Sequence, residues 1–322
     1  MNKSSFTAAG TLPIKIITDS NIIADCANRI IRPIHLQINP TNKCPLKCSF
    51  CSCDNRNSNI ELDFNLLSDA LLKYKKYGTR AVTITGGGDP LAYSKINELL
   101  KFLFDYKIDI GFVTNSILFK NVSLDIFKNV TWCRISVSDE QRLNKKLQSI
   151  ITSCNIDWSF SYVITSNLNL DNLIDCIYFA NEHKFTHLRL VDNILDEKTN
   201  SKMDYIKKCL NDKSIDDSIV IYQGRKQFSR GHKRCLLSLL KPNIAADGSI
   251  MPCCGVQYAT EIPTLDYTST FSLGNISKDI DNIYSNNIYF DGSICKKCYY
   301  SDYNSILNTL WDSKNIKHNN FI

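Results

Sequence analysis

The chain has 322 residues, of which 43% are hydrophobic and 22% charged, values ordinary for a globular protein with a substantial core. It contains no run of about 18 uninterrupted apolar residues, and its first segment, Met1–Phe6, lacks the apolar stretch of a secretion signal, so we expect a cytoplasmic protein without a membrane partner. The net charge of +6 is spread along the chain without a run of five basic residues, which argues against a nucleic-acid-binding surface. Fourteen cysteines in such a chain suggest ligation of a metal or cluster in a reducing compartment.

The predicted elements begin with an N-terminal extension, residues 1–33, in which only one short helix around residues 22–31 is expected. From Ile34 onward the pattern repeats strand, loop and helix, which is typical of a parallel sheet covered by helices. The first helix is marked by apolar residues at helical spacing and ended by a glycine: Leu67, Leu71, Tyr74 and Gly78. The predicted strands are residues 34–39, 81–84, 108–113, 132–137, 158–164 and 187–191. These six units predict an α/β core over residues 34–215.

Three cysteines, Cys44, Cys48 and Cys51, follow the first predicted strand with the spacing CX3CX2C. Three thiolates on one tight loop can hold three irons of a 4Fe-4S cluster and leave the fourth iron open to a small molecule. Zinc binding, a redox dithiol or simple burial are the alternatives for such cysteines. The alternating strand before the loop, and a second motif after it, argue for the cluster.

That second motif is the run Gly86-Gly87-Gly88-Asp89-Pro90, which ends a β-rich segment about 35 residues after Cys51. Glycines let the backbone approach a ligand closely, although such a run taken alone also fits an ordinary turn between a strand and a helix.

CX3CX2C with the aromatic Phe50 before its last cysteine resembles the signature of the radical S-adenosylmethionine (radical SAM) superfamily. Gly86–Pro90 resembles the GGEP element of that family, with Asp89 in place of glutamate. The resemblance implies a fold of the partial (β/α)6 barrel type, and a 4Fe-4S cluster whose open iron binds S-adenosylmethionine and whose electron cleaves it to a 5'-deoxyadenosyl radical. It also implies cofactor contacts by these residues: Phe50 near the adenine, Gly86, Gly87, Gly88 and Asp89 at the amino group, Asn115 at the ribose and Ser136 at the carboxylate.

Cysteines return after residue 230, where the repeated strand and helix pattern stops. Cys235 is followed after twelve residues by Gly248, after four more by Cys253, and later by the CX2C pair Cys295 and Cys298. Asp247-Gly248 predicts a hairpin turn that brings Cys235 and Cys253 together.

This spacing resembles the twitch module, a shortened SPASM domain, and implies one auxiliary 4Fe-4S cluster held by the four cysteines. We expect this small cysteine-rich domain at residues 216–305, followed by a tail at residues 306–322. A zinc site with four cysteine ligands is the alternative occupant, and Cys254 is the alternative to Cys253.

The resemblance implies a radical SAM oxidoreductase that abstracts hydrogen from its substrate, with net oxidation of a small molecule such as a sugar or aminocyclitol aided by the auxiliary cluster. Two alternatives stay open: a maturase that modifies a precursor peptide, and a nucleic-acid-associated protein with a structural zinc site. The implied partners are a small-molecule or peptide substrate and a reductant such as flavodoxin or ferredoxin. No catalytic base is selected among Asp139, Glu140 and Asp192.

Overall fold

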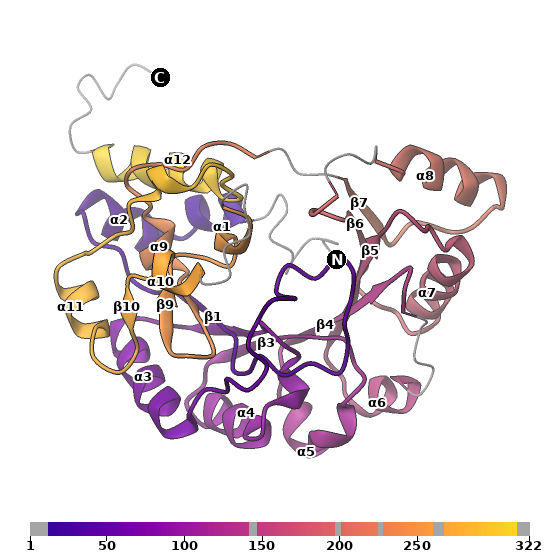
Figure 1. Cartoon of the computed structure of the whole chain (residues 1–322), viewed down its shortest axis with the longest axis horizontal. Coiled ribbons are helices and arrows are strands. Elements are labelled where there is room, and N and C mark those ends of the chain that lie inside the picture. Colours follow the sequence, from indigo (N-terminus) through magenta and orange to yellow (C-terminus); the bar gives the residue numbers. More distant parts are fainter. Residues whose placement is uncertain (1–11, 142–146, 197–200, 225–227, 260–266, 314–322) are drawn as a thin grey trace. The chain divides into compact units, whose positions relative to one another are not determined.

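The structure is a computed structural model that describes residues 12–141, 147–196, 201–224, 228–259 and 267–313 (Figure 1). The chain forms two compact units. Among the described residues, the first unit comprises residues 40–61, 83–141, 147–196 and 201–224, and the second comprises residues 12–39, 62–82, 228–259 and 267–313. Each unit is therefore assembled from segments that are distant in the sequence.

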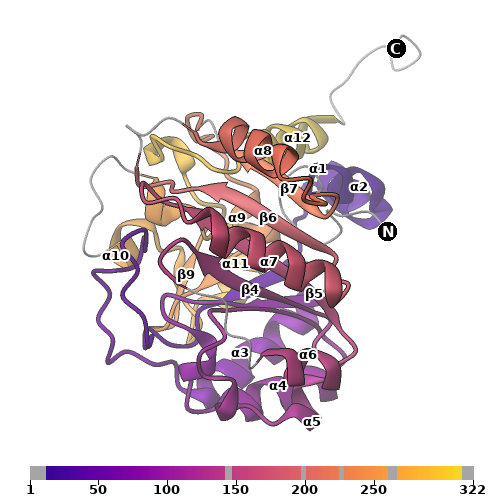
Figure 2. The same ribbon diagram turned by 90° about the vertical axis from the view of Figure 1, so that its right-hand side faces the viewer.

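The first unit is built on parallel strands in the order β3-β4-β5-β6-β7. These strands are β3 (Asp109–Thr114), β4 (Trp132–Ser138), β5 (Asp157–Ile164), β6 (His187–Asp192) and β7 (Val220–Gly224). Its helices are η1 (Pro90–Ala92), α4 (Ile96–Asp105), η2 (Phe119–Asn121), α5 (Leu124–Phe127), α6 (Leu147–Ser153), α7 (Leu170–Glu182) and α8 (Met203–Asp212). Figure 2 shows α7 and α8 on the same side of β5 and β6, as expected for helices that connect parallel strands.

Alternation along the strands separates an apolar face from a polar face in this unit. Phe160 of β5 is fully buried, and its ring centroid lies 6.1 Å from that of Phe179 in α7. Ser161 is the next residue and points to the opposite face, where the strand register aligns it with Ser136 of β4 and Arg189 of β6. Polar side chains therefore occupy the face that turns away from the covering helices.

The second unit contains β1 (His35–Ile38), which pairs in parallel with β8 (Asn243–Ile244). β9 (Ser249–Met251) pairs antiparallel with β8 and with β10 (Gly274–Asn275). Its helices are α1 (Leu12–Thr18), α2 (Ser20–Ala27), α3 (Phe64–Tyr77), α9 (Leu237–Leu240), η3 (Val256–Tyr258), α10 (Tyr267–Phe271), α11 (Ile280–Ser285), η4 (Gly292–Ile294) and α12 (Ser301–Asp312). The predicted turn between β8 and β9 is present, with Gly248 in the left-handed region at φ 84°.

Helix α3 shows why this sequence folds locally as predicted. The side chain of Asp63 accepts a hydrogen bond from the N–H of Leu66 at 2.8 Å and caps the first turn. Gly78 ends the helix with φ 119°, a conformation that glycine adopts without steric cost. The buried face consists of Leu67, Ala70, Leu71 and Tyr74, at the spacing that predicted the helix.

All six predicted strands are present, including β2 (Ala81–Ile84), and their ends differ from the prediction by at most one residue. The prediction missed β7 and the three short strands β8 to β10, and it placed one short helix where the structure has α1 and α2. The described strands do not close into a barrel, in agreement with the expected partial barrel. The domain boundaries at residues 33, 215 and 305 stay predictions.

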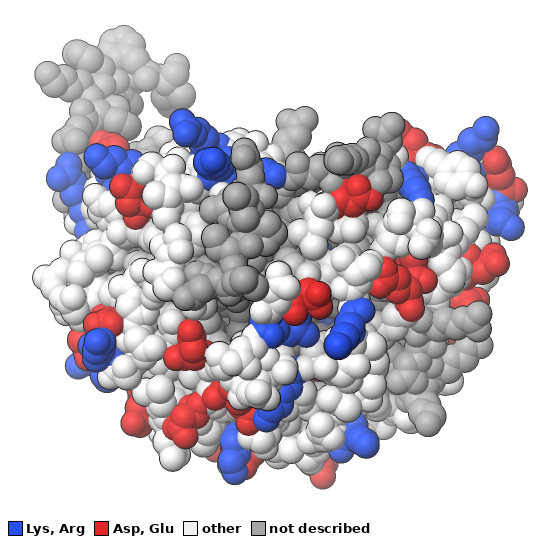
Figure 3. All heavy atoms as spheres, in the orientation of Figure 1, with Lys and Arg blue, Asp and Glu red and all other residues white. Residues whose placement is uncertain are grey.

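The surface carries charges of both signs. Figure 3 shows Lys and Arg side chains interspersed with Asp and Glu side chains on the face that it presents. Exposed pairs such as Lys101 and Asp105, whose charged atoms are 2.7 Å apart, contribute little to stability. None of the described helices has both the length and the apolar character needed to cross a membrane.

Candidate functional site

The CX3CX2C cysteines lie in the first unit, in the irregular segment between β1 and α3. A turn closes the end of the motif, where the N–H of Cys51 donates to the carbonyl of Cys48 at 3.1 Å. Burial raises the pKa of the Cys44 thiol, and it raises that of Cys48 to about 11. Negative charge on Cys51 raises the pKa of both further, so the three thiols lie within electrostatic reach of one another.

Two side-chain donors point at sulfurs of this motif. Asn115 Nδ2 lies 3.6 Å from Cys44 Sγ, and Arg56 Nη1 lies 3.3 Å from Cys51 Sγ. Donors of this kind stabilise thiolate over thiol, and thiolates are the form of cysteine that ligates iron. The residues present therefore fit a cluster held by Cys44, Cys48 and Cys51.

The glycine motif is hydrogen-bonded directly to the segment that leads into the cysteines. Gly88 N–H donates to the carbonyl of Thr41 at 2.9 Å, and Asp89 N–H donates to the carbonyl of Lys43 at 2.8 Å. A Cβ atom on Gly88 would lie 2.0 Å from the Lys43 carbonyl oxygen, so a side chain cannot be accommodated there without movement of the backbone. In this structure, the absence of a side chain at Gly88 lets the backbone of the glycine motif pack closely against the backbone that leads into the cysteine loop.

Asp89 is only 3% exposed, and its carboxylate binds backbone and side-chain donors of the chain itself. It accepts from Thr114 Oγ1 at 2.9 Å, from Asn115 N at 2.7 Å and from Leu91 N at 2.9 Å. The structure thus brings together the cysteine loop, the glycine motif and Asn115 at the end of β3.

The two other residues expected at the cofactor are also in the first unit. Ser136 is partly exposed on β4, beside Ser161 of β5, and Phe50 is partly exposed within the cysteine loop. Their contacts with S-adenosylmethionine, like those of the glycine motif, Asp89 and Asn115, stay predictions.

Sequence reasoning missed Arg56 at the cysteine loop, and it named Glu140 only as a candidate base, without its contact to that loop. Glu140 follows β4 and accepts from Ser49 through both the backbone N–H, at 3.1 Å, and the hydroxyl. No periodicity or motif marks either residue in the sequence, because their roles depend on contacts made by an irregular loop.

The three candidate bases have different surroundings. Asp139 accepts from Tyr162 Oη at 2.9 Å, Thr165 N at 2.6 Å and Asn169 N at 2.9 Å, so its oxygens hold the loop after β5. Asp192 ends β6, and within the described part of the chain its buried Oδ2 has no hydrogen-bond partner. Glu140 is engaged at Ser49, as described above.

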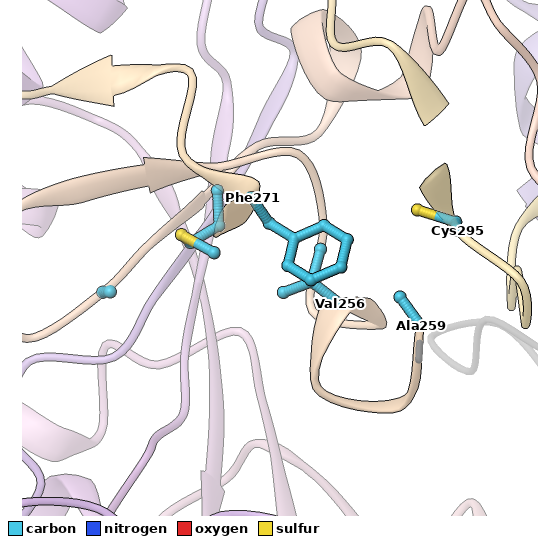
Figure 4. Packing of buried hydrophobic residues seen from close by; sticks show 6 residues of the cluster. Val256, Ala259, Phe271 and Cys295 are labelled. Carbon is cyan, nitrogen blue, oxygen red and sulfur yellow. The ribbon is translucent and has the colours of Figure 1, made fainter. Parts of the chain in front are cut away.

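The C-terminal cysteines lie in the second unit and line one pocket of about 390 Å³, its open side included. Cys235 precedes α9, Cys253 follows β9, Cys295 follows η4 and Cys298 precedes α12. Apolar and aromatic side chains complete the wall, among them Val256, Ala259, Phe290, Tyr299 and Tyr300. Figure 4 shows the sulfur of Cys295 directed toward the ring of Phe271 and Val256, with Ala259 beside them in the same buried cluster. Different segments of the chain thus supply four thiols to one largely apolar pocket.

Burial dominates the electrostatics of this pocket. It raises the pKa of Cys235 and of Cys295 to about 12 each, and that of Cys253 well above its ordinary range. Negative charge on the neighbouring thiols raises each of these values further. These three thiols, with such raised pKa values, ionise together only when a metal group supplies positive charge, which is how metal binding deprotonates cysteine.

Neutral donors are already in place at two of these sulfurs. Asn304 Nδ2 lies 3.5 Å from Cys235 Sγ, and the N–H of Gly255 lies 3.3 Å from Cys253 Sγ. Cys254 does not line the pocket, and its Sγ lies 3.2 Å from Tyr300 Oη. Of the two adjacent cysteines, Cys253 is therefore the one that faces the other three.

Among the residues that the structure describes, no three His, Cys, Asp or Glu side chains converge closely enough to hold a single metal ion. The four C-terminal cysteines do not converge on one point but line the wall of their pocket.

Comparison with known proteins gives a match between residues 38–151 and the model of the Radical SAM superfamily. The chain carries a radical SAM domain. The matched residues include the CX3CX2C loop, the glycine motif, Asn115 and Ser136. A radical SAM domain implies a 4Fe-4S cluster and S-adenosylmethionine as its cofactors.

Curated relatives match part of this chain at low identity. A GTP 3',8-cyclase of Campylobacter jejuni is 28% identical over 200 residues, which are 54% of this chain and 60% of the relative. A GTP 3',8-cyclase of Clostridium perfringens is 30% identical over 174 residues, which are 46% of this chain and 52% of the relative. The matches thus span about half to three fifths of the relatives' own length.

Solved structures share the fold over more of the chain. SuiB of Streptococcus suis covers 89% of this chain and 77% of its own, with a TM-score of 0.59 and 17% identity. The structure described as native anSMEcpe with bound AdoMet and Kp18Cys peptide covers 83% of this chain and 87% of its own, with a TM-score of 0.51 and 16% identity. At these identities the likeness shows the fold alone.

Proposed function

We propose that this protein is a radical SAM oxidoreductase with two 4Fe-4S clusters. Cys44, Cys48 and Cys51 would hold the cluster that binds S-adenosylmethionine, and Cys235, Cys253, Cys295 and Cys298 would hold one auxiliary cluster. The observation that carries the proposal is the pocket lined by these four C-terminal cysteines in a chain that also has a radical SAM domain. When bound, the cofactors supply a 5'-deoxyadenosyl radical that takes hydrogen from a substrate carbon, and a second cluster that can accept the electron released in a net oxidation.

The residues of the chain prepare both sites. Asn115 and Arg56 direct N–H donors at sulfurs of the first site, and Asn304 and Gly255 do the same at the second. Asp89 fixes the end of β3 beside the cysteine loop through Thr114 and Asn115. These contacts hold the thiols in place before any cofactor binds, which lowers the conformational cost of binding.

Oxidation of an alcohol also releases a proton, which a base must accept. We propose Asp192 as this base, because its Oδ2 has no partner within the described residues, whereas Asp139 and Glu140 hold loops of the chain. Its position at the carboxyl end of β6 supports this role, since chemistry in folds of repeated strand and helix units lies at that end of the strands.

For the substrate we propose a small molecule such as a sugar or aminocyclitol. The curated relatives support a small molecule over a peptide, because they are named for a reaction of GTP, which contains a sugar. The same relatives favour a second candidate function, the cyclisation of a nucleotide, which needs no net electron acceptor. Maturation of a precursor peptide is the third function that the substrate experiment below distinguishes.

The first experiment measures iron, sulfide and zinc in anaerobically reconstituted protein, together with 5'-deoxyadenosine formed under dithionite. We expect about eight irons in the wild type, and about four in Cys44→Ala/Cys48→Ala/Cys51→Ala and in Cys253→Ala. Nucleoside release should disappear in the triple variant and persist in Cys253→Ala. One zinc with about four irons would overturn the auxiliary cluster, and no nucleoside from the wild type would overturn the radical chemistry.

The second experiment identifies the substrate class by transfer of deuterium into 5'-deoxyadenosine. Deuterated monosaccharides and aminocyclitols, deuterated GTP and deuterated peptides are compared under the same conditions. Transfer from a sugar or aminocyclitol, with a ketone product, supports the oxidoreductase. Transfer from GTP or from a peptide alone contradicts it in favour of the corresponding alternative.

A further inference from the structure

The side chain of Arg56 joins the two ends of the CX3CX2C loop. Its Nε donates to the carbonyl of Asn42 at 2.8 Å, and its Nη1 donates to the carbonyl of Cys53. Asn42 precedes the first cysteine of the motif and Cys53 follows the last, so one guanidinium bridges the segment that contains all three thiols. The guanidinium can bridge two carbonyls because its N–H donors are fixed in different directions, whereas a lysine ammonium is a single compact charge.

The same guanidinium contacts the last cysteine of the motif directly. Arg56 Nη1 lies 3.3 Å from Cys51 Sγ. Its charge also reaches the other thiols, because it lowers the pKa of Cys44 and Cys48 against the larger raising effect of burial. Arg56 thus combines a hydrogen bond to one sulfur with a favourable field at the others.

An anion is attached to the opposite part of the loop. Glu140 accepts from the N–H of Ser49 at 3.1 Å and from its hydroxyl, between Cys48 and Cys51. Its charge raises the pKa of Cys48, after the larger effects of burial and of the neighbouring thiols. The cysteine loop is therefore held by two side chains of opposite charge.

We propose that Arg56 is a positioning residue that keeps the cysteine loop closed and raises the reduction potential of the cluster bound there, and that Glu140 lowers that potential. The inference rests on the proposed function in one respect, the assignment of Cys51 as a cluster ligand. One-electron reduction by an external reductant adds one negative charge at the site. Positive charge and N–H donors at a ligating sulfur stabilise the reduced state, and a nearby carboxylate destabilises it.

The test is a redox titration of the reconstituted full-length protein, followed by electron paramagnetic resonance. The signal that is missing from Cys44→Ala/Cys48→Ala/Cys51→Ala belongs to the N-terminal cluster. Arg56→Met, Arg56→Lys and Glu140→Gln are compared with the wild type. Lys43→Met is the matched control, because Lys43 lies in the same loop, and its ammonium pairs with Glu61 at 3.1 Å.

We expect Arg56→Met to lower the ratio of reduced to oxidised cluster about tenfold at a fixed applied potential. For a one-electron couple this corresponds to a reduction potential that is lower by about 59 mV. Arg56→Lys should shift the ratio in the same direction but less, since it keeps the charge and loses the fork. Glu140→Gln should raise the ratio. Lys43→Met should lower it less than Arg56→Met does, because the Lys43 ammonium is already offset by Glu61. If Arg56→Met does not retain its iron, Arg56→Lys and Glu140→Gln decide the question by the same readout.

An unchanged potential in Arg56→Met, or a shift equal to that of Lys43→Met, would overturn the inference. A shift of Glu140→Gln in the same direction as Arg56→Met would also overturn it, since opposite charges must act oppositely. Failure of the proposed function looks different. In that case the triple cysteine variant would bind as much iron as the wild type, and the signal assigned to the N-terminal cluster would be absent.

Discussion

The carboxylate of Asp89 accepts a hydrogen bond from the N–H of Asn115 at 2.7 Å, and Asn115 in turn directs its side-chain amide at Cys44 Sγ, 3.6 Å away. The acidic residue of the glycine motif is thus connected to a cysteine through one intermediate residue. Because its oxygens are occupied by Thr114, Asn115 and Leu91, its role in this structure is to hold the end of β3 against the cysteine loop.

Replacement of this carboxylate should damage both stability and the first site. Asp89→Asn turns one acceptor oxygen into a donor that faces other donors, so the free energy of unfolding should fall by about 1–3 kcal/mol. 5'-Deoxyadenosine formation should fall with it, because Asn115 would no longer be fixed beside Cys44. Urea unfolding and the nucleoside assay measure the two effects. Asp125→Asn, at an exposed position, should change neither, and equal effects of the two substitutions would refute this role of Asp89.

Replacing either of two buried asparagines in the second unit by leucine should change the free energy of unfolding, but in opposite directions. Asn304 is 1% exposed, accepts from Leu237 N at 3.0 Å and donates to Cys235 Sγ. Asn304→Leu leaves these groups unpaired, so the free energy of unfolding should fall by about 2 kcal/mol.

Asn243 is 3% exposed, and within the described residues its Oδ1 has no hydrogen-bond partner. Asn243→Leu removes a buried polar atom that gains nothing from the fold, so the apo-protein should become about 1 kcal/mol more stable. Urea unfolding of both variants without cofactors is the measurement. Destabilisation of similar size in both would contradict this account.

His187 should make the stability of the protein depend on pH below neutrality. It is fully buried on β6, and burial, aided by the charges of Arg134 and Arg189, lowers its pKa to about 3 from an ordinary value of 6.5. The folded state keeps His187 neutral, while the unfolded state takes up a proton below pH 6.5. Its contribution to stability is therefore complete above pH 6.5 and is lost as the pH falls toward 3.

Between pH 7.5 and 5.0 this loss should amount to about 2 kcal/mol, at 1.36 kcal/mol per pH unit below 6.5. His187→Gln should remove that part of the slope, whatever it does to stability at pH 7.5. Urea unfolding of both proteins at the two pH values checks the prediction. A slope that is unchanged in the variant would rule it out.

The adjacent cysteines Cys253 and Cys254 should differ in their effect on the auxiliary site. Cys253 lines the pocket with the other three thiols, whereas Cys254 contacts Tyr300 Oη. Cys253→Ala should therefore reduce the iron content by about four, and Cys254→Ala should leave it unchanged. Iron analysis of the two reconstituted variants makes the comparison. If only Cys254→Ala lost iron, Cys254 and not Cys253 would be the ligand of the auxiliary cluster.

The sequence by itself determined the features that depend on neighbours along the chain. The strands could be predicted because alternating residues face opposite sides, and α3 because its apolar residues recur on one face between a capping aspartate and a terminal glycine. The two cysteine motifs could be recognised for a similar reason, since a chelating loop needs a fixed spacing of ligands. Strands β8 to β10 escaped prediction because two or three residues are too few to show a period.

Only the tertiary structure decided which side chains meet. It placed the cysteines of separate segments around one pocket, with Cys253 and not Cys254 in its lining. It also brought Arg56 Nη1 to Cys51 Sγ, and it brought the Asp89 carboxylate to the N–H of Asn115 beside the cysteine loop. These relationships join residues that lie in irregular loops or far apart in the chain, where neither a period nor a spacing records them. The physical reason is that hydrogen bonds, burial and charge act through space, so their partners are defined only once the chain has folded.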